Sequence, residues 1–218
     1  MTPDDIVAAL RAPTGDVLQR RGDHAVDFPG SKSRARAFAD GELISRPAAV
    51  LVPLVKRDAG LHVILTRRTD HLSDHAGQIS FPGGRQEEFD ATLEETALRE
   101  TEEEIGLARR HIDLVGRIDD YYTVTGYQVT PVVGLITPPF DLKPDDHEVA
   151  EVFEVPLSFI LDPRNQKLQT VTFEGTRRRY FAIPYREYYI WGATAGMLVN
   201  FSEVIRANAP SLNRQSEY

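Results

Sequence analysis

Four glutamates within five residues give this sequence its clearest chemical signal: Glu100, Glu102, Glu103 and Glu104, directly preceded by Arg99. An α-helix turns by about 100° per residue, so Glu100, Glu103 and Glu104 fall on one face, where like charges repel each other. A hard divalent cation relieves such repulsion because it binds carboxylate oxygens. The spacing therefore indicates a metal site, with a solvated acidic helix face as the alternative.

Two neighbouring features favour the metal site. Arg99 can hold one of the glutamates through a pair of parallel hydrogen bonds. The turn Pro82-Gly83-Gly84 lies just upstream, and its glycines allow a phosphate chain or a metal ion to approach the backbone closely. The turn and the glutamates thus predict one site for the metal ion and the phosphate chain.

The acids lie on a helix that we expect over residues 92–105, with Gly106 closing its carboxyl end. The apolar Leu98 and Ile105 point roughly away from the acids and are expected to bury against a sheet. The helix is therefore predicted to be amphipathic, with an acidic outer stripe.

Aliphatic and β-branched runs predict the strands of that sheet. An early pair, 48–56 and 61–66, is separated by Asp58-Ala59-Gly60, which is typical of a hairpin. Further strands are expected at 113–119, 129–137, 151–155, 168–173 and 178–183, and further helices at 2–11 and 193–207. Strands interleaved with two substantial helices predict an α+β fold, with a mixed β-sheet sandwiched between helices in an α/β/α arrangement.

The chain is expected to divide into three parts. Residues 1–46 are predicted to form an N-terminal helix and an extended lead-in, because 12–46 is rich in charge, Gly and Pro and has little periodicity. Residues 47–207 form the main domain and 208–218 a C-terminal tail. The role of the lead-in stays open, as does the choice between a monomer and a homodimer.

Composition excludes several classes of protein. A net charge of −8 over 218 residues repels a phosphate backbone, so no nucleic-acid partner is expected. The absence of cysteine removes disulfides and thiolate metal sites and favours a cytoplasmic location. The most apolar run, 48–55, is broken by Pro53 and is too short to span a bilayer. No membrane association is expected.

The segment from Gly84 to Leu107 resembles the Nudix box of the Nudix hydrolase superfamily, G-x5-E-x7-R-E-U-x-E-E-x-G-U with U aliphatic. The matching positions are Gly84, Arg99, Glu100, Glu103, Glu104, Gly106 and Leu107. Two positions differ from the pattern. Asp90 stands for the first glutamate and is followed by eight residues rather than seven, and Thr101 stands for the first aliphatic residue.

A second resemblance narrows the subgroup. The run Ile64-Leu65-Thr66-Arg67-Arg68-Thr69, followed by Gly77 and Phe81-Pro82-Gly83-Gly84, is similar to the signature L-L-T-x-R-[SA]-x3-R-x3-G-x3-F-P-G-G of coenzyme A pyrophosphatases. Ser73 stands where that signature has arginine. The segments 125–131 and 190–195 also look like this subgroup, and the resemblance covers roughly residues 47–205.

The resemblance implies metal-assisted attack of water on a nucleoside diphosphate derivative, with Mg²⁺ or Mn²⁺ as cofactor. It implies Glu100 and Glu104 as metal ligands, Glu103 as a further ligand or the base, and Arg99 as the residue that orients Glu103. Coenzyme A or an acyl derivative would be cleaved to 4′-phosphopantetheine and adenosine 3′,5′-bisphosphate. The expected substrate-binding residues are Arg67, Arg68, Gly83, Gly84, Tyr127 and Arg178.

Alternatives remain at the level of function. The alternative substrates are ADP-ribose, a dinucleoside polyphosphate or another nucleoside diphosphate derivative, because the resemblance implies that the box binds the pyrophosphate and not its substituents. A non-catalytic nucleotide-binding module of the same fold is the competing class, although such a module has no need for a repulsive carboxylate face.

Several single residues carry a second interpretation. His71 and His75 are four apart and form a candidate zinc pair, although a hard cation prefers oxygen ligands. Glu148 and Glu151 are candidates for a distal ligand or base, or are surface charges. Three further groups are left between substrate contact and packing or surface roles: the tyrosines Tyr121, Tyr122 and Tyr127, the arginines 177–179, and Trp191, for which packing against the last helix is favoured.

Overall fold

The computed structural model describes residues 1–11, 21–26, 37–38, 40–71, 77–173 and 176–209. Its largest element is a nine-stranded sheet in which β1, β7, β8, β2, β3 and β4 follow in order, while β5 pairs with β2, β6 with β8 and β9 with β3. The bounds are β1 Arg21–Gly22, β2 Arg46–Arg57, β3 Gly60–Arg68, β4 Ile79–Ser80, β5 Gly83–Arg85, β6 Ile112–Arg117, β7 Tyr121–Tyr122, β8 Tyr127–Ile136 and β9 Val149–Pro156. The sheet is mixed, because β2 runs parallel to β8 and antiparallel to β3.

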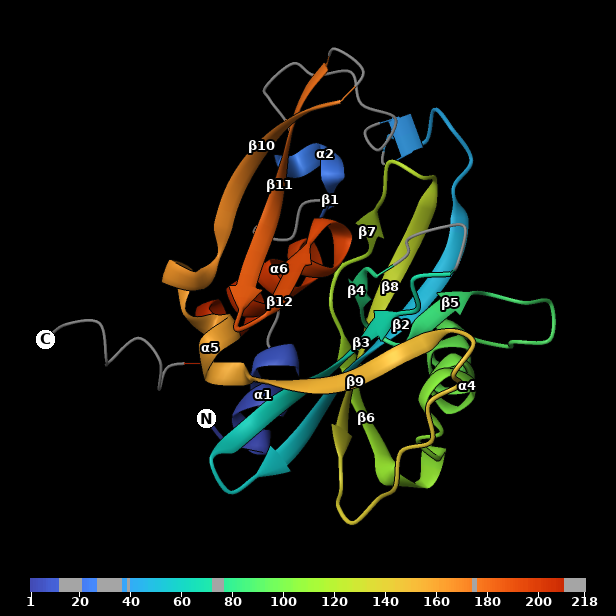
Figure 1. Cartoon of the computed structure of the whole chain (residues 1–218), viewed down its shortest axis with the longest axis vertical. Coiled ribbons are helices and arrows are strands. Elements are labelled where there is room, and N and C mark those ends of the chain that lie inside the picture. The colour runs from blue at the N-terminus through green and yellow to red at the C-terminus, as the bar shows by residue number, and fades with distance from the viewer. Residues whose placement is uncertain (12–20, 27–36, 39, 72–76, 174–175, 210–218) are drawn as a thin grey trace, which may run out of the picture.

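Helices cover both faces of this sheet (Figure 1). Helix α4 (Leu93–Ile105) lies on one face, where it packs on β2 and β5. The other face carries α1 (Pro3–Arg11), α5 (Leu157–Leu161) and α6 (Gly192–Asn208). The described part of the chain also contains the short helix α2 (Asp23–Val26) and two 3-10 turns, η1 (Arg109–His111) and η2 (Pro163–Asn165). The predicted α+β arrangement, a mixed sheet between helices, is confirmed.

A second, three-stranded sheet stands beside α6. Its strands are β10 (Lys167–Phe173), β11 (Thr176–Tyr185) and β12 (Tyr188–Trp191), all antiparallel. Ile183 and Ile190 face the core together with residues of α6 and of the main sheet. The sequence analysis did not predict this separate sheet or the strand β12.

The helix α4 begins and ends where local signals place it. The Thr92 hydroxyl accepts a hydrogen bond from the Glu95 amide, and the Glu95 carboxylate accepts one from Ala91 N, which is a reciprocal cap. Gly106 closes the helix with φ of 67°, a conformation that favours glycine. The expected burial of Ile105 is confirmed, whereas Leu98 is only partly buried. None of the helices in the described ranges is long and apolar enough to span a membrane.

Candidate active site

Arg99 is the centre of a dense charge network on α4. Its guanidinium donates to both carboxylate oxygens of Asp90 at 2.9 and 2.8 Å, to Glu100 Oε1 at 2.9 Å and to Glu103 Oε2 at 2.9 Å. These charge-assisted contacts raise the pKa of Arg99, with Asp90 as the largest cause. One arginine therefore fixes three acids, including two that are proposed metal ligands.

Asp90 forms the buried side of this network. Besides the two bonds from Arg99, its Oδ2 accepts from the Thr96 hydroxyl and from the Glu87 amide, each at 3.0 Å. The hydrogen bonds from Arg99 hold the pKa of Asp90 well below its usual range, against the opposing effect of burial. Asp90 has a shorter side chain than the glutamate of the pattern, and one more residue separates it from Arg99. Its carboxylate nevertheless reaches the Arg99 guanidinium.

Glu100 sits against the glycine turn. A Cβ added at Gly84 would lie 2.5 Å from Glu100 Cδ, so only glycine leaves this space to the carboxylate. Burial raises the pKa of Glu100, and Arg99 opposes that effect. The Glu100 carboxylate therefore packs directly against the backbone of β5.

Glu104 is buried, which corrects the expected acidic outer stripe. Strand β5 covers it, and Gly83 N donates to Glu104 Oε2 at 3.3 Å. Burial raises the pKa of Glu104 to about 8, Glu100 and Glu148 add to the rise, and the Gly83 amide and Arg68 oppose it. Of the three predicted ligands, only Glu103 is largely exposed.

Arg68, at the end of β3, stands between two acids. Its Nη1 lies 4.0 Å from Glu104 Oε1 and 3.9 Å from Glu148 Oε2, which is beyond hydrogen-bond distance. Its Nε is buried without a partner among the described residues. The compensation that Arg68 gives to Glu104 is therefore incomplete.

This donor set suits a hard divalent cation. All of its donors are carboxylate oxygens, the ligands that Mg²⁺ prefers. Burial raises the pKa of Glu104, and the Arg68 guanidinium stays 4.0 Å from its carboxylate. Within the described ranges, no three His, Asp or Glu side chains already surround a single point at ligand distance. Glu100 and Glu103 instead turn to Arg99.

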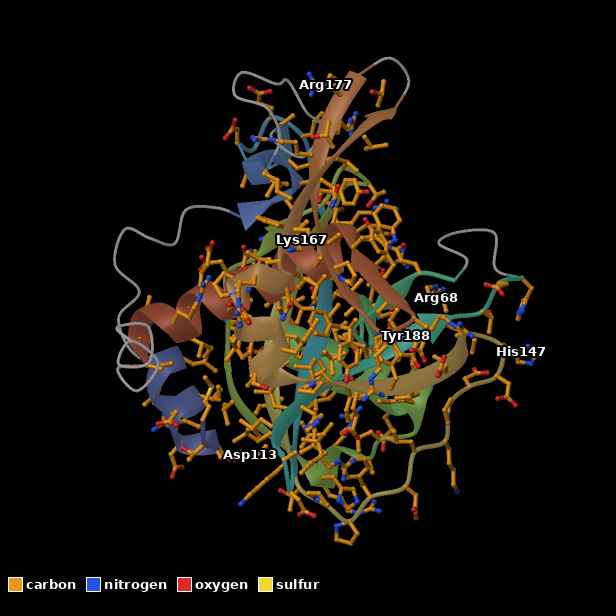
Figure 2. The ribbon with its side chains drawn as sticks, turned by 60° about the vertical axis from the view of Figure 1, so that its left-hand side comes forward. Arg68, Asp113, His147, Lys167, Arg177 and Tyr188 are labelled. Atoms are coloured by element: carbon orange, nitrogen blue, oxygen red, sulfur yellow. The ribbon has the colours of Figure 1, made fainter. Side chains whose placement is uncertain are left out.

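The other predicted site residues lie in different parts of the molecule. Arg67 Nη2 lies 3.7 Å from Glu151 Oε2 at the same end of β3. Tyr127 opens β8, and its ring lies under the Arg46 guanidinium, 4.2 Å from centroid to Cζ. Arg178 is on β11, opposite Val171, in the hairpin that extends away from α4 in Figure 1. Figure 2 likewise labels the neighbouring Arg177 far from Arg68.

The remaining candidates divide in the same way. Tyr121 is buried in the core and donates to Asp23 Oδ1 at 2.8 Å, so it does not line a pocket. Trp191 is half exposed and meets Tyr180 edge to face. Ser73 and His75 lie outside the described residues, so the zinc pair has no structural account.

Two contributors were not predicted from the sequence. Thr96 supports Asp90, and Tyr188 donates to Glu151 Oε1 at 2.6 Å. The six-residue spacing of Asp90 and Thr96 is a weak local signal. Tyr188 comes from the second sheet, so no local pattern indicates its contact.

A carboxylate cluster under a glycine turn, with arginines at its rim, has the chemistry of a metal-assisted hydrolase of phosphate compounds. The NUDIX domain model matches residues 45–181. The chain is 41% identical over 154 residues to the uncharacterized Nudix hydrolase NudL of Escherichia coli O1:K1 / APEC, a match that covers 70% of this chain and 79% of that protein. The chain belongs to the Nudix family.

Solved structures give more distant matches. RenU, a Nudix hydrolase from M. smegmatis, is 22% identical with a TM-score of 0.43, over 55% of this chain and 76% of that one. A MutT protein from Methanosarcina mazei Go1 is 20% identical with a TM-score of 0.46, over 81% and 99%.

Family membership fixes the general activity. The protein is a Nudix pyrophosphohydrolase, an enzyme that acts on phosphoanhydride bonds. Nudix hydrolases use divalent metal ions and bind small-molecule nucleotide substrates. The particular substrate is a separate question.

Proposed function

We propose that the enzyme cleaves the pyrophosphate linkage of coenzyme A or acyl-coenzyme A, giving 4′-phosphopantetheine and adenosine 3′,5′-bisphosphate. The supporting observation is that three separate motifs meet at one carboxylate. Arg68 comes from the segment 64–69, Gly83 from the turn 81–84, and both approach Glu104 of the box helix. The two segments of the subgroup signature thus adjoin the catalytic helix.

Glu100 and Glu104 would hold the metal, with Glu103 as a further ligand or as the base. A bound Mg²⁺ or Mn²⁺ would supply charge neutralisation at the pyrophosphate and a lowered pKa for bound water. Arg99 orients Glu100 and Glu103 from its anchor on Asp90. The closeness of Gly84 to Glu100 and of Gly83 to Glu104 sets where these two carboxylates lie.

The phosphate groups of the substrate meet the arginines at the end of β3. Arg67 and Arg68 each offer a guanidinium that is only loosely paired with protein acids, at 3.7 to 4.0 Å. Guanidinium groups suit phosphate oxygens because their donors form a planar fork. Tyr127 is proposed as a contact for the adenine ring of the substrate, while Arg178 lies away from this centre.

We propose Glu103 as the general base, since it is largely exposed and held by Arg99. Glu148 is the alternative, because it is half exposed beside Arg68. Separate Glu103→Gln and Glu148→Gln variants distinguish them. A general base must be deprotonated to act, so the base is the residue whose loss removes the rise of kcat with increasing pH while metal affinity is kept.

The testing experiment compares coenzyme A, ADP-ribose and diadenosine polyphosphates side by side with Mg²⁺ and Mn²⁺, using Glu104→Gln as control. Preferential cleavage of coenzyme A that is lost in Glu104→Gln supports the proposal. Preferential cleavage of another substrate would refute it and favour a different nucleoside diphosphate derivative. Ser73, which replaces the arginine of the signature, is the observation that favours this second candidate.

A further inference from the structure

A contact between the two sheets lies beside the proposed phosphate site. Tyr188, on β12, donates its hydroxyl hydrogen to Glu151 Oε1 at 2.6 Å. Its ring stacks on Phe153 of β9, with centroids 3.7 Å apart and an interplanar angle of 6°. Figure 2 shows Tyr188 in the same region as Arg68. The stacked ring therefore fixes where the phenol oxygen stands.

The same glutamate faces Arg67. Arg67 and Glu151 are direct partners in the pairing of β3 with β9, yet Glu151 Oε2 remains 3.7 Å from Arg67 Nη2. A relaxed arginine–carboxylate pair closes to about 2.8 Å. Glu151 thus makes its short hydrogen bond with Tyr188. Arg67, whose side chain is 47% exposed, has no hydrogen-bonded acid among the residues that the structure describes.

We propose that Tyr188 holds Glu151 off Arg67, and so keeps the Arg67 guanidinium available to an anionic phosphate group of the substrate. Tyr188 is a positioning residue in this account, since it acts on the substrate only through Glu151 and Arg67. Without its hydroxyl, Glu151 would turn to Arg67 and compete with the substrate phosphate. This inference rests on the proposed function for its substrate, but not for the contact between the three side chains.

The phenol stays a donor across ordinary assay conditions. The hydrogen bond to Glu151, together with burial, raises the pKa of Tyr188 to about 12. Tyr188→Phe removes that donor and retains the ring that stacks on Phe153, so the variant is expected to fold. Tyr189→Phe is the matched control, because Tyr189 is the next residue on the strand and its hydroxyl meets Tyr180 instead.

The first measurement does not depend on any substrate. Phenylglyoxal modifies accessible arginines, and mass spectrometry of the digested full-length chain gives the rate at Arg67. We expect Tyr188→Phe to slow this rate roughly threefold to fivefold, the scale of an exposed ion pair. Adding Glu151→Gln should restore the rate, since a neutral amide no longer pairs with the guanidinium, and Tyr189→Phe should leave it unchanged.

The second measurement is the KM for coenzyme A in the same variants. Tyr188→Phe should raise KM about fivefold with kcat within about twofold, and Glu151→Gln should reverse the rise. An unchanged modification rate in Tyr188→Phe overturns the inference, as does a slowed rate with an unchanged KM. If the unaltered enzyme does not cleave coenzyme A, the proposed function fails, and the modification rates still decide whether Tyr188 controls Arg67.

Discussion

Replacing Asp90 by asparagine should destabilise the fold strongly, although Asp90 is not a proposed metal ligand. The carboxylate is buried and accepts four hydrogen bonds, two of them from Arg99. Asparagine keeps one acceptor oxygen but turns an amide donor toward a guanidinium donor, which leaves Arg99 with only the carboxylates of Glu100 and Glu103 as partners. Breaking a buried ion pair by removing one side costs about 3–5 kcal/mol. Because two carboxylates stay beside Arg99, we expect a smaller loss, about 2–4 kcal/mol.

Urea denaturation at pH 7 measures this loss. With a slope of about 2 kcal/mol per M of urea, the midpoint should fall by about 1–2 M. Glu102→Gln is the control on the same helix, because Glu102 forms a half-exposed pair with Arg109 at 3.2 Å. Such surface pairs contribute below about 1 kcal/mol. An Asp90→Asn loss no larger than that of Glu102→Gln would refute the reasoning.

The pH dependence gives a second check on the same variant. The pKa of Asp90 is lower in the folded chain than its ordinary value of 3.8, so its stabilising contribution is fully present above about pH 4 and is lost as pH falls toward the folded value. Linkage limits that loss to about 1.4 kcal/mol per pH unit. The difference between the two proteins should therefore be constant from pH 5 to 8 and shrink below pH 4.

Three further substitutions test separate parts of the molecule. Gly84→Ala should lower kcat at least about tenfold, because the added methyl displaces the end of the Glu100 side chain. The free energy of unfolding should change by less than about 1 kcal/mol. Steady-state kinetics measures the first effect and urea unfolding the second. Arg68→Ala should raise KM for the substrate roughly tenfold, with partial rescue in Arg68→Lys, and equal KM values in all three proteins would contradict a phosphate contact. Tyr121→Phe should cost about 1–3 kcal/mol, measured by urea unfolding, because it removes the hydroxyl that donates to Asp23.

Local signals were enough to predict the helix that carries the site. Thr92 and Gly106 mark its ends through a side-chain cap and a left-handed residue, and both effects act within one turn. The hairpin of β2 and β3 follows in the same way from the glycine at Gly60. These features depend on neighbours in sequence, so a single chain is sufficient to predict them.

Contacts between distant segments could not be predicted in this way. Helical periodicity puts Glu104 on the same face as Glu100 and Glu103, but it cannot show that strand β5 lies over that part of the face. The second sheet was missed for a related reason: Tyr188–Trp191 is only four residues long, and its pairing with β11 is decided by the core beneath it. The contact of Tyr188 with Glu151 then depends on how the two sheets meet.

The charge balance of the centre explains why its parts belong together. Five carboxylates, from Asp90, Glu100, Glu103, Glu104 and Glu148, share two arginines, Arg99 and Arg68. Fully ionised, the group carries three uncompensated negative charges, and burial makes Glu104 the member whose ionisation costs most. A divalent cation would offset most of that excess, and Arg67, which lies outside this count, would remain for the anionic substrate. We therefore propose that the mutual repulsion of these acids is what favours the binding of a metal ion at this site.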